Sequence, residues 1–318
     1  MIWVGWRQQR TETVIAAGIL CLLTLLLLPS GLEMASAYHR DGLSHCLGQD
    51  PSSSCARAID SFTSRFESTS NLIGWFTLVP GVIGALLAAP FVLELEQGTY
   101  RLAWTQSITR RRWIAGKLGL AVGAALLAAL ALTLLVTWWR SPFVHLQGRL
   151  DGAAFDSEGT VVFGYTLFAL GLAAAVGVVW RRAVPALMVA FAGYFAARLF
   201  VDIWLRQRLV APLTATWSVS GHTTPANLNH AWVLTQHPSD RFGNLVSVPL
   251  GRCVRLTGNH GKIVDPACLA AHGSGYMHAV YHPASHFWTL QLIETGLFAG
   301  AALVLIGFAA WWTHRRVA

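Results

Sequence analysis

Long apolar runs separated by short polar segments dominate the chain. Residues 13–29, 72–93, 118–139, 161–180, 184–205 and 287–312 form six such runs. Roughly twenty apolar residues in an α-helix cross the hydrocarbon core of a bilayer, which is about 30 Å thick. The pattern therefore predicts an all-α integral membrane protein with six transmembrane helices.

Polar and loop-forming residues separate three expected parts. Residues 1–205 comprise an N-terminal interfacial helix and the first five spans, with a polar cytoplasmic segment at 94–117. Residues 206–286 form a sizeable extracellular loop region or small domain before the last helix. Its Pro, Gly and Asn content and its runs at 217–220 and 245–248 favour short strands or irregular structure. Residues 287–318 form the sixth span and a cytoplasmic tail.

Composition and charge support this topology. Hydrophobic residues make up 54% of the chain, charged residues 12%, and the mean hydropathy is +0.49, whereas a soluble domain has about 25% charged residues. Cations in short loops mark the cytoplasmic side, so both termini are expected there. The net charge of +8 reflects this topology, and no nucleic acid is expected as a partner. The cytoplasmic cations would be Arg7, Arg10, Arg101, Arg110, Arg111, Arg112, Lys117, Arg181, Arg182, Arg315 and Arg316.

The first span has an alternative interpretation as a cleaved secretory signal. Arg7 and Arg10, the Leu-rich run 22–28 and the small residues 35–37 resemble the parts of such a signal. The apolar run is longer than usual for a signal, however, and cleavage would leave five spans with the two termini on opposite sides of the membrane. These points favour a retained transmembrane helix.

Four cysteines lie in the two expected outer loops, in the oxidising compartment. Cys46 and Cys55 share one loop, and Cys253 and Cys268 share the other. An even set outside the cell indicates two disulfides. Pairing within each loop is favoured, and pairing across the loops remains open. Cys21 lies inside the first span and is expected to be a packed thiol.

The last outer loop is rich in histidine but does not match a known metal or catalytic motif. His278, His282 and His286 are spaced so that they could share a helix face and bind zinc. Pro283 would break that helix, and no Glu completes an H-E-x-x-H pattern, so no metal site is expected. The segment 258–262 lacks the residues of a phosphate-binding loop, and no nucleophile motif is present, so an enzyme is not expected.

A few polar residues lie inside the expected spans. Arg198 and Asp202 are one helical turn apart, which predicts an ion pair near the outer interface. Glu294 lies about two turns into the sixth span. A carboxylate facing lipid there would cost about 2–3 kcal/mol, so Glu294 should face protein or a water-filled path. Glycine pairs at 119 and 123 and at 296 and 300 suggest close helix contacts.

The polar segment between the second and third spans carries an apolar stripe. Tyr100, Trp104 and Ile108 recur every four residues, so on a helix they would form one apolar face. Such a face needs a surface on which to be buried, either a partner protein or the lipid headgroup layer.

Several motifs together resemble the actinobacterial ABC-2 type permeases. The pieces 96–99, 101–107 and 109–117 look like the cytoplasmic loop of that family. Residues 3–10 resemble its opening Trp-x-x-Trp-Arg-x-x-Arg pattern, and residues 148–156 and 281–296 resemble two further segments. The resemblance covers most of the chain. The outer loop of about eighty residues before the last span departs from the short outer helices of many exporters of this type.

This resemblance implies the ABC-2, type V exporter-like permease fold and a transport function. The chain would be the permease subunit of an ATP-binding-cassette exporter in a bacterial plasma membrane. It would pair with a second permease chain, identical or different, and with two copies of a separate ATPase. That ATPase would bind ATP and Mg, so this chain would need no cofactor. The alternative is a non-transporting membrane sensor or assembly protein whose outer domain binds a ligand.

The resemblance also implies where the ATPase would bind. In the family, the loop between the second and third spans forms a coupling helix that rests on the ATPase. The expected coupling residues are Glu96, Thr99, Tyr100, Arg101, Trp104, Gln106, Ser107, Ile108 and Arg110.

The topology can be tested with single cysteines introduced into the chain. A cysteine in place of Arg110 should react with a membrane-impermeant thiol reagent only after the cells are opened, because its loop is cytoplasmic. A cysteine in place of Arg241 should react in intact cells. Labelling at position 110 from outside would contradict the six-span topology.

Overall fold

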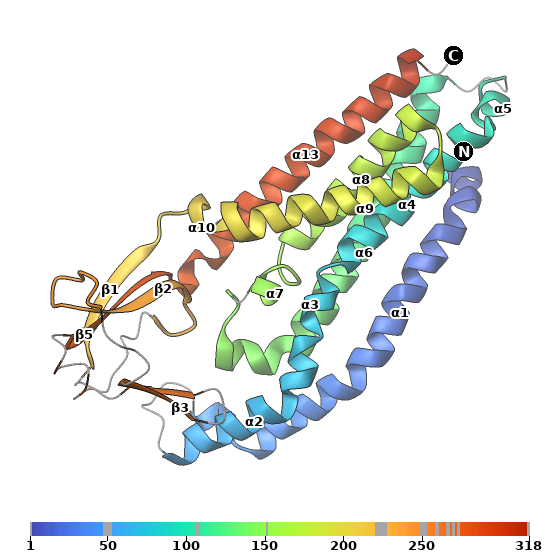
Figure 1. The fold of residues 1–318 in the computed structure, drawn as a ribbon. Coiled ribbons are helices and arrows are strands. Elements are labelled where there is room, and N and C mark those ends of the chain that lie inside the picture. Colours follow the sequence, from blue (N-terminus) through green and yellow to red (C-terminus); the bar gives the residue numbers. More distant parts are fainter. Residues whose placement is uncertain are drawn as a thin grey trace. The chain divides into compact units, whose positions relative to one another are not determined.

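The computed structural model describes residues 2–46, 53–105, 109–150, 152–219, 228–247, 253–257, 261–264, 268, 271 and 274–316. It is mostly helical (Figure 1). Six of the described helical stretches are long and apolar enough to cross a membrane, which confirms the predicted fold class. They are Thr11–Arg40, Ile73–Gln97, Arg110–Gln147, Val161–Trp180, Ala183–Leu209 and Ala284–Arg316.

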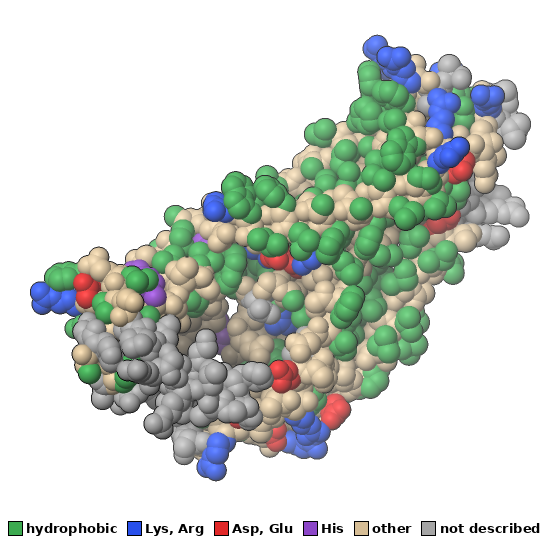
Figure 2. Space-filling view, in the orientation of Figure 1, with side chains coloured by type: hydrophobic (Ala, Val, Ile, Leu, Met, Phe, Trp, Pro, Cys, Tyr) green, Lys and Arg blue, Asp and Glu red, His purple; other side chains and the backbone are tan. Residues whose placement is uncertain are grey.

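The chain divides into two compact units, which we describe separately. Unit 1 contains Met1–Gln147, Gly152–Arg206 and Leu290–Ala318, and unit 2 contains Gly148–Asp151 and Gln207–Thr289. Hydrophobic side chains cover much of the visible face of unit 1 (Figure 2). Leu127 on α6 (Arg110–Gln147), Met188 on α9 (Ala183–Phe200) and Leu303 on α13 (Phe287–Arg316) are each about 70% exposed, as expected for side chains that face lipid.

Helix α1 (Ile2–Arg40) continues well beyond the predicted end of the first span at residue 29. Pro29 does not end the helix, because the following turn packs against α6 (Arg110–Gln147): Gly31 lies against Trp139, whose indole Nε1 donates to Ser30 Oγ at 3.0 Å. The expected interfacial helix shows no break from the span, since the helix is continuous from Ile2. Cys21 is exposed on α1 rather than packed.

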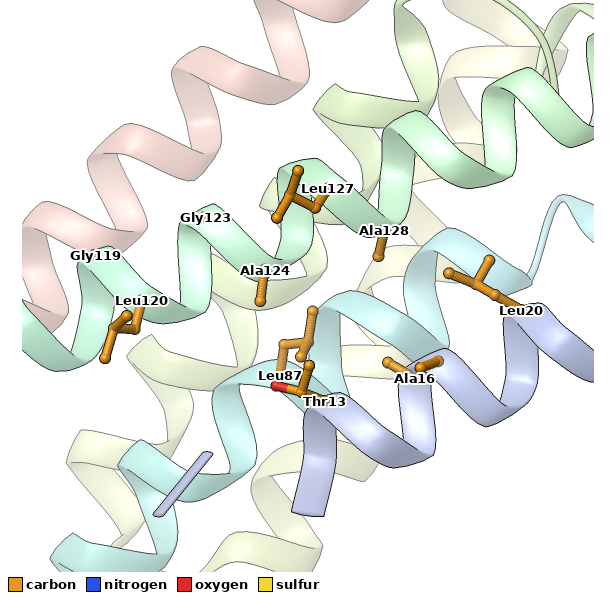
Figure 3. Close-up of a pocket in the computed structure, with 11 residues that line it drawn as sticks. Thr13, Ala16, Leu20, Leu87, Gly119, Leu120, Gly123, Ala124, Leu127 and Ala128 are labelled. Atoms are coloured by element: carbon orange, nitrogen blue, oxygen red, sulfur yellow. The ribbon is translucent and has the colours of Figure 1, made fainter. Parts of the chain in front are cut away.

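An open apolar groove of about 430 Å³ lies between α1, α4 (Val79–Gln97) and α6 (Figure 3). Leu20, Leu87 and Leu127 line it, and Gly119 and Gly123 form part of its α6 side. A Cβ added to either glycine would meet no atom within 4 Å. The expectation that these two glycines mark a close helix contact is therefore wrong within this chain, and the same holds for the pair at 296 and 300.

Two of the close contacts that require glycine lie between α4 and α8 (Val161–Trp180). A Cβ on Gly84 of α4 would collide with the carbonyl oxygen of Thr166, and one on Gly177 of α8 would collide with Val92. These two helices are largely buried and form the centre of unit 1. Helix α9 (Ala183–Phe200) packs against both of them.

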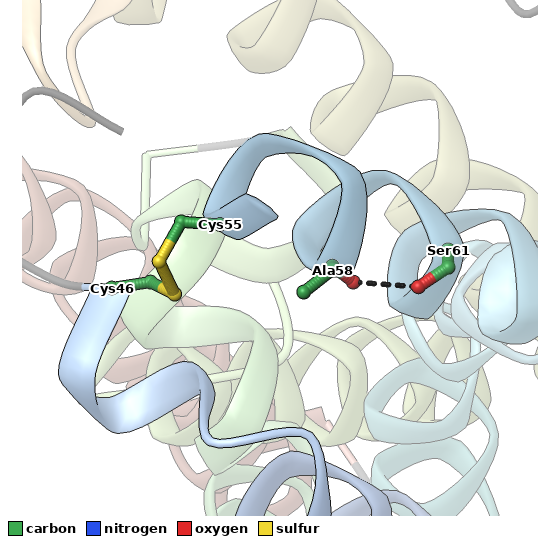
Figure 4. The surroundings of a disulfide bond; sticks show 4 residues. All are labelled: Cys46, Cys55, Ala58 and Ser61. Carbon is green, nitrogen blue, oxygen red and sulfur yellow. Dashed lines mark hydrogen bonds between the residues drawn. A yellow bond between two sulfur atoms is a disulfide. The ribbon is translucent and has the colours of Figure 1, made fainter. Parts of the chain in front are cut away.

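The first span is followed by an amphipathic helix that was not predicted from the sequence. Helix α2 (Ser53–Asn71) buries Phe62 and Phe66, one turn apart, against the short helix η1 (Leu43–Cys46), α1 and α6. The Cys46–Cys55 disulfide joins η1 to the start of α2 (Figure 4). The short helices α5 (Tyr100–Thr105) and α7 (Gly152–Phe155) lie between spans. The short helix α3 (Ile73–Phe76) begins the second span, and α10 (Arg206–Leu209) ends the fifth.

Unit 2 contains the expected short strands. Three antiparallel strands pair in the order β1 (Leu213–Ser218), β5 (Tyr276–His282) and β2 (Trp232–Ser239). Strands β3 (Val254–Thr257) and β4 (Gly261–Val264) form a hairpin. The Cys253–Cys268 disulfide joins a residue just before this hairpin to one shortly after it. Both disulfides thus join cysteines of the same loop.

Two further details of unit 2 bear on the sequence predictions. The run at 245–248 does not continue as a strand within the described residues, where Leu245 makes only an isolated bridge to Ser239. His278 and His282 lie on β5, and His286 ends the short helix η5 (Ala284–His286), which precedes α13 (Phe287–Arg316). The three histidines therefore share no helix face, in agreement with the helix break expected at Pro283, because strand β5 continues up to that proline.

The packing of α4 on α8 predicts the effect of enlarging a glycine. Replacing Gly84 with Val should destabilise the protein by about 1–3 kcal/mol, because the side chain has no room beside the Thr166 carbonyl. The same change at Gly300, which faces open space on α13, should cost much less. Thermal unfolding of the two purified variants in detergent measures the difference. Equal melting temperatures would contradict the packing.

Candidate functional site

Unit 1 contains a cluster of charged and polar side chains that are almost completely buried. We call Asp156, Tyr165, Arg198, Arg206 and Glu294 the ionic cluster. Asp156, Tyr165 and Glu294 have no exposed surface, Arg206 is 2% exposed and Arg198 is 8% exposed. They come from the segment after α7, from α8, α9, α10 and α13, so residues from distant parts of the sequence meet at one place.

Arg206 is the centre of the ionic cluster. Its Nε donates to Glu294 Oε2 at 2.9 Å, and its Nη2 donates to Glu294 Oε1 at 3.0 Å, which is a bidentate arrangement. Its Nη1 donates to Asp202 Oδ1 at 2.6 Å, and Nη2 also contacts Asp156. The guanidinium carbon lies 4.3 Å from the centre of the Phe155 ring. One side chain therefore holds three carboxylates together.

Asp156 receives hydrogen bonds from both arginines. Arg198 donates to its Oδ2 and Arg206 to its Oδ1. The Tyr165 hydroxyl lies 3.0 Å from Asp156 Oδ1 and also contacts Glu294 Oε1, so its single proton can serve either carboxylate. The two buried carboxylates are thus balanced by two guanidinium groups, and the third carboxylate, Asp202, is partly exposed at 31%.

A π-helical turn between the two arginines allows both to reach Asp156. The residues between α9 and α10, Val201–Leu205, form η2, a π-helix. Eight residues of regular α-helix would rotate Arg206 by roughly 80° away from Arg198. The extra residue in the wider turn returns Arg206 to about the same face. Interruptions of this kind are frequent at functional sites.

Gln291 of α13 positions the loop that carries Asp156. Its Oε1 accepts the backbone N–H of Val161 at 2.9 Å, which satisfies one free donor at the start of α8. Its Nε2 donates to the carbonyl oxygens of Phe155, at 2.8 Å, and Glu158, at 3.2 Å. The side chain has no exposed surface. The loop between α7 and α8 is therefore fixed to α13 next to the ionic cluster.

The structure corrects the expected pairing within the fifth span. Arg198 does not pair with Asp202: it binds Asp156, and Asp202 binds Arg206. The regular helical spacing on which the prediction relied ends at the π-turn. Glu294 is fully buried against protein, and its partner is Arg206, for which the sequence predicts a place in the outer loop. A buried carboxylate in a span requires a cation nearby, and this requirement was the one sequence signal that Glu294 has a positively charged partner.

The apolar stripe of the polar segment is only partly available to a partner. Tyr100 is 2% exposed, and its ring packs 4.7 Å from Trp104 and 6.5 Å from Trp113 of α6. Phe91 completes this aromatic cluster. The expectation that Tyr100 forms part of an exposed stripe is therefore wrong, because the chain itself supplies the apolar surface. Ile108, like Gln106 and Ser107, lies outside the described residues.

The other expected coupling residues divide into two groups. The Glu96 carboxylate accepts the backbone N–H of Ala183 at 2.7 Å, so it satisfies a donor at the start of α9. Thr99, Arg101 and Arg110 are exposed, and the Arg110 guanidinium lies 4.4 Å from the centre of the Trp104 ring. The structure thus places the exposed polar groups on the outside of an aromatic cluster.

Comparison with known proteins gives one family match. A family described as "ABC-2 membrane transporter related" matches residues 17–206, which is more than half of the chain. The matched region runs from within the first span to near the end of the fifth. It includes every residue of the ionic cluster except Glu294. No curated protein and no solved structure matches the chain significantly.

The ionic cluster predicts a large effect of removing Arg206. Replacing it with Ala leaves Glu294 buried without its bidentate partner and should destabilise the protein by about 3–5 kcal/mol. The matched control is Arg208→Ala, since Arg208 is exposed two residues further on. Unfolding of the purified proteins by heat or denaturant measures both effects.

A double variant separates the loss of the ion pair from general damage. Adding Glu294→Leu to Arg206→Met removes the stranded carboxylate, while Asp156 keeps Arg198 as its partner. The double variant should therefore be less destabilised than the sum of the two single changes. Simple additivity would argue against a direct coupling of Arg206 to Glu294.

Proposed function

Because the chain belongs to the ABC-2 membrane transporter related family, we propose that it is the permease subunit of an exporter powered by a separate ATPase. It is a multi-pass membrane protein and a transporter membrane subunit, not itself a catalyst. The proposed complex contains two ATP-binding-cassette subunits, which bind ATP and Mg, and a second permease chain. Its location would be a bacterial plasma membrane. The family match over residues 17–206 is the observation that carries this proposal.

The distribution of charge supports the proposed orientation. Arginines are exposed in the α4–α6 connection, in the α8–α9 connection and at the end of α13. Blue side chains gather at the end of unit 1 near α5 and the C-terminal end of α13 (Figure 2). The side chains of Arg111 and His314 approach within 3.4 Å there. Such a concentration of cations in short connections favours the cytoplasmic side.

The α4–α6 connection supports a coupling role by its construction. The aromatic cluster of Tyr100, Trp104, Trp113 and Phe91 ties α5 to both neighbouring spans. A force on α5 would therefore be passed to α4 and α6 through packed rings rather than through a flexible loop. Thr99, Arg101 and Arg110 remain exposed on this segment, and they are the groups we propose to contact the ATPase.

The ionic cluster supports a role in the change of state that transport requires. It joins α8, α9, α10 and α13 through charge-assisted hydrogen bonds in a buried setting. Separating α13 from α10 would strand Glu294, which makes an intermediate separation unfavourable. We propose that the ionic cluster holds α8, α9, α10 and α13 together in one state of the transporter. ATP hydrolysis by the partner would supply the energy that separates these helices.

Two measurements test the proposed function. Affinity purification of the chain from its native cells should recover an ATPase with a phosphate-binding loop, and ATP should drive accumulation of a substrate in inside-out vesicles. Recovery of the ATPase without ATP-dependent accumulation of any compound screened would contradict export. If no ATPase is recovered, the sensor or assembly function with a ligand-binding outer unit takes its place.

Reversal of a charge on the coupling segment provides a sharper prediction. Arg101→Glu should weaken binding of the ATPase by about tenfold or more, because an exposed interface cation is replaced by an anion. Arg182→Glu is the matched control, since Arg182 is exposed on the α8–α9 connection. Binding of the purified ATPase to each variant, measured as Kd at fixed salt, checks the difference. Equal losses at the two positions would contradict a specific contact at Arg101.

A further inference from the structure

Two histidines of unit 2 face each other across a proline. His282 is the last residue of β5, and His286 is the last residue of η5. Pro283 between them has an extended backbone, with φ −68° and ψ 157°, so the chain turns rather than continuing as a helix or strand. The turn brings the two Nδ1 atoms to 3.3 Å.

The surroundings of His282 orient its ring. The side chain has no exposed surface, and the ring stacks on Trp232 with centres 5.3 Å apart. Its Nε2 lies 3.4 Å from the carbonyl oxygen of Gln207, which can only accept a hydrogen bond. The proton of the neutral ring therefore belongs on Nε2, and Nδ1 presents a lone pair to His286.

This arrangement has the dimensions of adjacent ligands on a metal ion. Zinc binds imidazole nitrogen at about 2.0–2.1 Å with tetrahedral angles, so two ligand nitrogens are about 3.3–3.4 Å apart. A metal-binding histidine commonly donates its other N–H to a backbone carbonyl, as the Gln207 contact provides here. We propose that His282 and His286 form a two-histidine site for a divalent transition-metal ion of the zinc class, with water as the remaining ligands.

The proposed metal site lies where the chain leaves the fifth span and enters the sixth. Gln207 lies in α10, at the end of the fifth span, and His286 directly precedes α13, the sixth span. A metal ion bound to His282 and His286 would therefore link α10 to the residue before α13, because His282 also contacts the Gln207 carbonyl oxygen. The described residues contain no group of three or more His, Cys, Asp or Glu around a possible ion, so the proposed site has two protein ligands. Binding should therefore be weaker than at a closed structural zinc site.

The test uses the full-length protein in detergent, stripped of metal by a chelator. Zinc chloride titrated in competition with a chromophoric chelator should show one equivalent that depends on this site. His286→Ala and His286→Gln should weaken that binding by at least about tenfold. His286 is preferred to His282 for substitution because its ring is only partly buried. Melting temperatures measured without metal should match the wild type.

His278→Ala is the matched control. His278 lies on the same strand, near His237, but its Nδ1 is 2.8 Å from Thr216 Oγ1 and is already hydrogen-bonded. This variant should bind zinc as the wild type does. X-ray absorption at the zinc edge should show two imidazoles per ion in the wild type. Unchanged zinc stoichiometry and affinity in both His286 variants, or no zinc bound by the wild type, would overturn the site and leave a hydrogen bond between the two rings.

Discussion

A charge that leaves water must find an opposite charge within hydrogen-bonding distance, and this constraint organises unit 1. Arg206 meets it through carboxylates from three separate places: Asp156 after α7, Asp202 in η2 and Glu294 in α13. Pairing such groups contributes little net stability, because desolvation offsets the attraction, but stranding one of them costs several kcal/mol. The cluster therefore acts mainly by selecting which helices can be neighbours.

The same constraint applies to backbone groups at helix ends. Gln291 accepts the Val161 N–H, Glu96 accepts the Ala183 N–H, and the Tyr194 hydroxyl donates to the Thr77 carbonyl at 2.7 Å. Each of these side chains belongs to a different helix from the backbone group that it satisfies. Helix ends that lie among apolar neighbours thus depend on tertiary contacts. A transport cycle that moves these helices must preserve or exchange these bonds.

The connections between spans are stabilised in two different ways. On the basic side, the α4–α6 connection is short and folds onto the spans through the aromatic rings of Tyr100, Trp104 and Trp113. Unit 2 instead has a small antiparallel sheet and a disulfide between Cys253 and Cys268. Small units bury too little apolar surface for a large core, so covalent closure of a loop compensates. The segment of η1 and α2 combines both means, because Phe62 of α2 is buried in the hydrophobic core and the Cys46–Cys55 bond joins η1 to α2.

The sequence by itself determined the number and approximate limits of the spans and the family, because these depend on local composition and short motifs. It favoured pairing of the cysteines within each loop because their separations are short, and the structure decided that pairing. The sequence did not determine the partners of the charged residues. Arg198 and Asp202 are one turn apart, yet each binds a different partner, since the π-turn shifts the helix face and Asp156 arrives from another element. Likewise, Tyr100 is buried by Trp113, and His282 meets His286 across Pro283. In each case the deciding contact joins groups whose proximity depends on how the backbone turns and packs, and that geometry exists only in the folded chain.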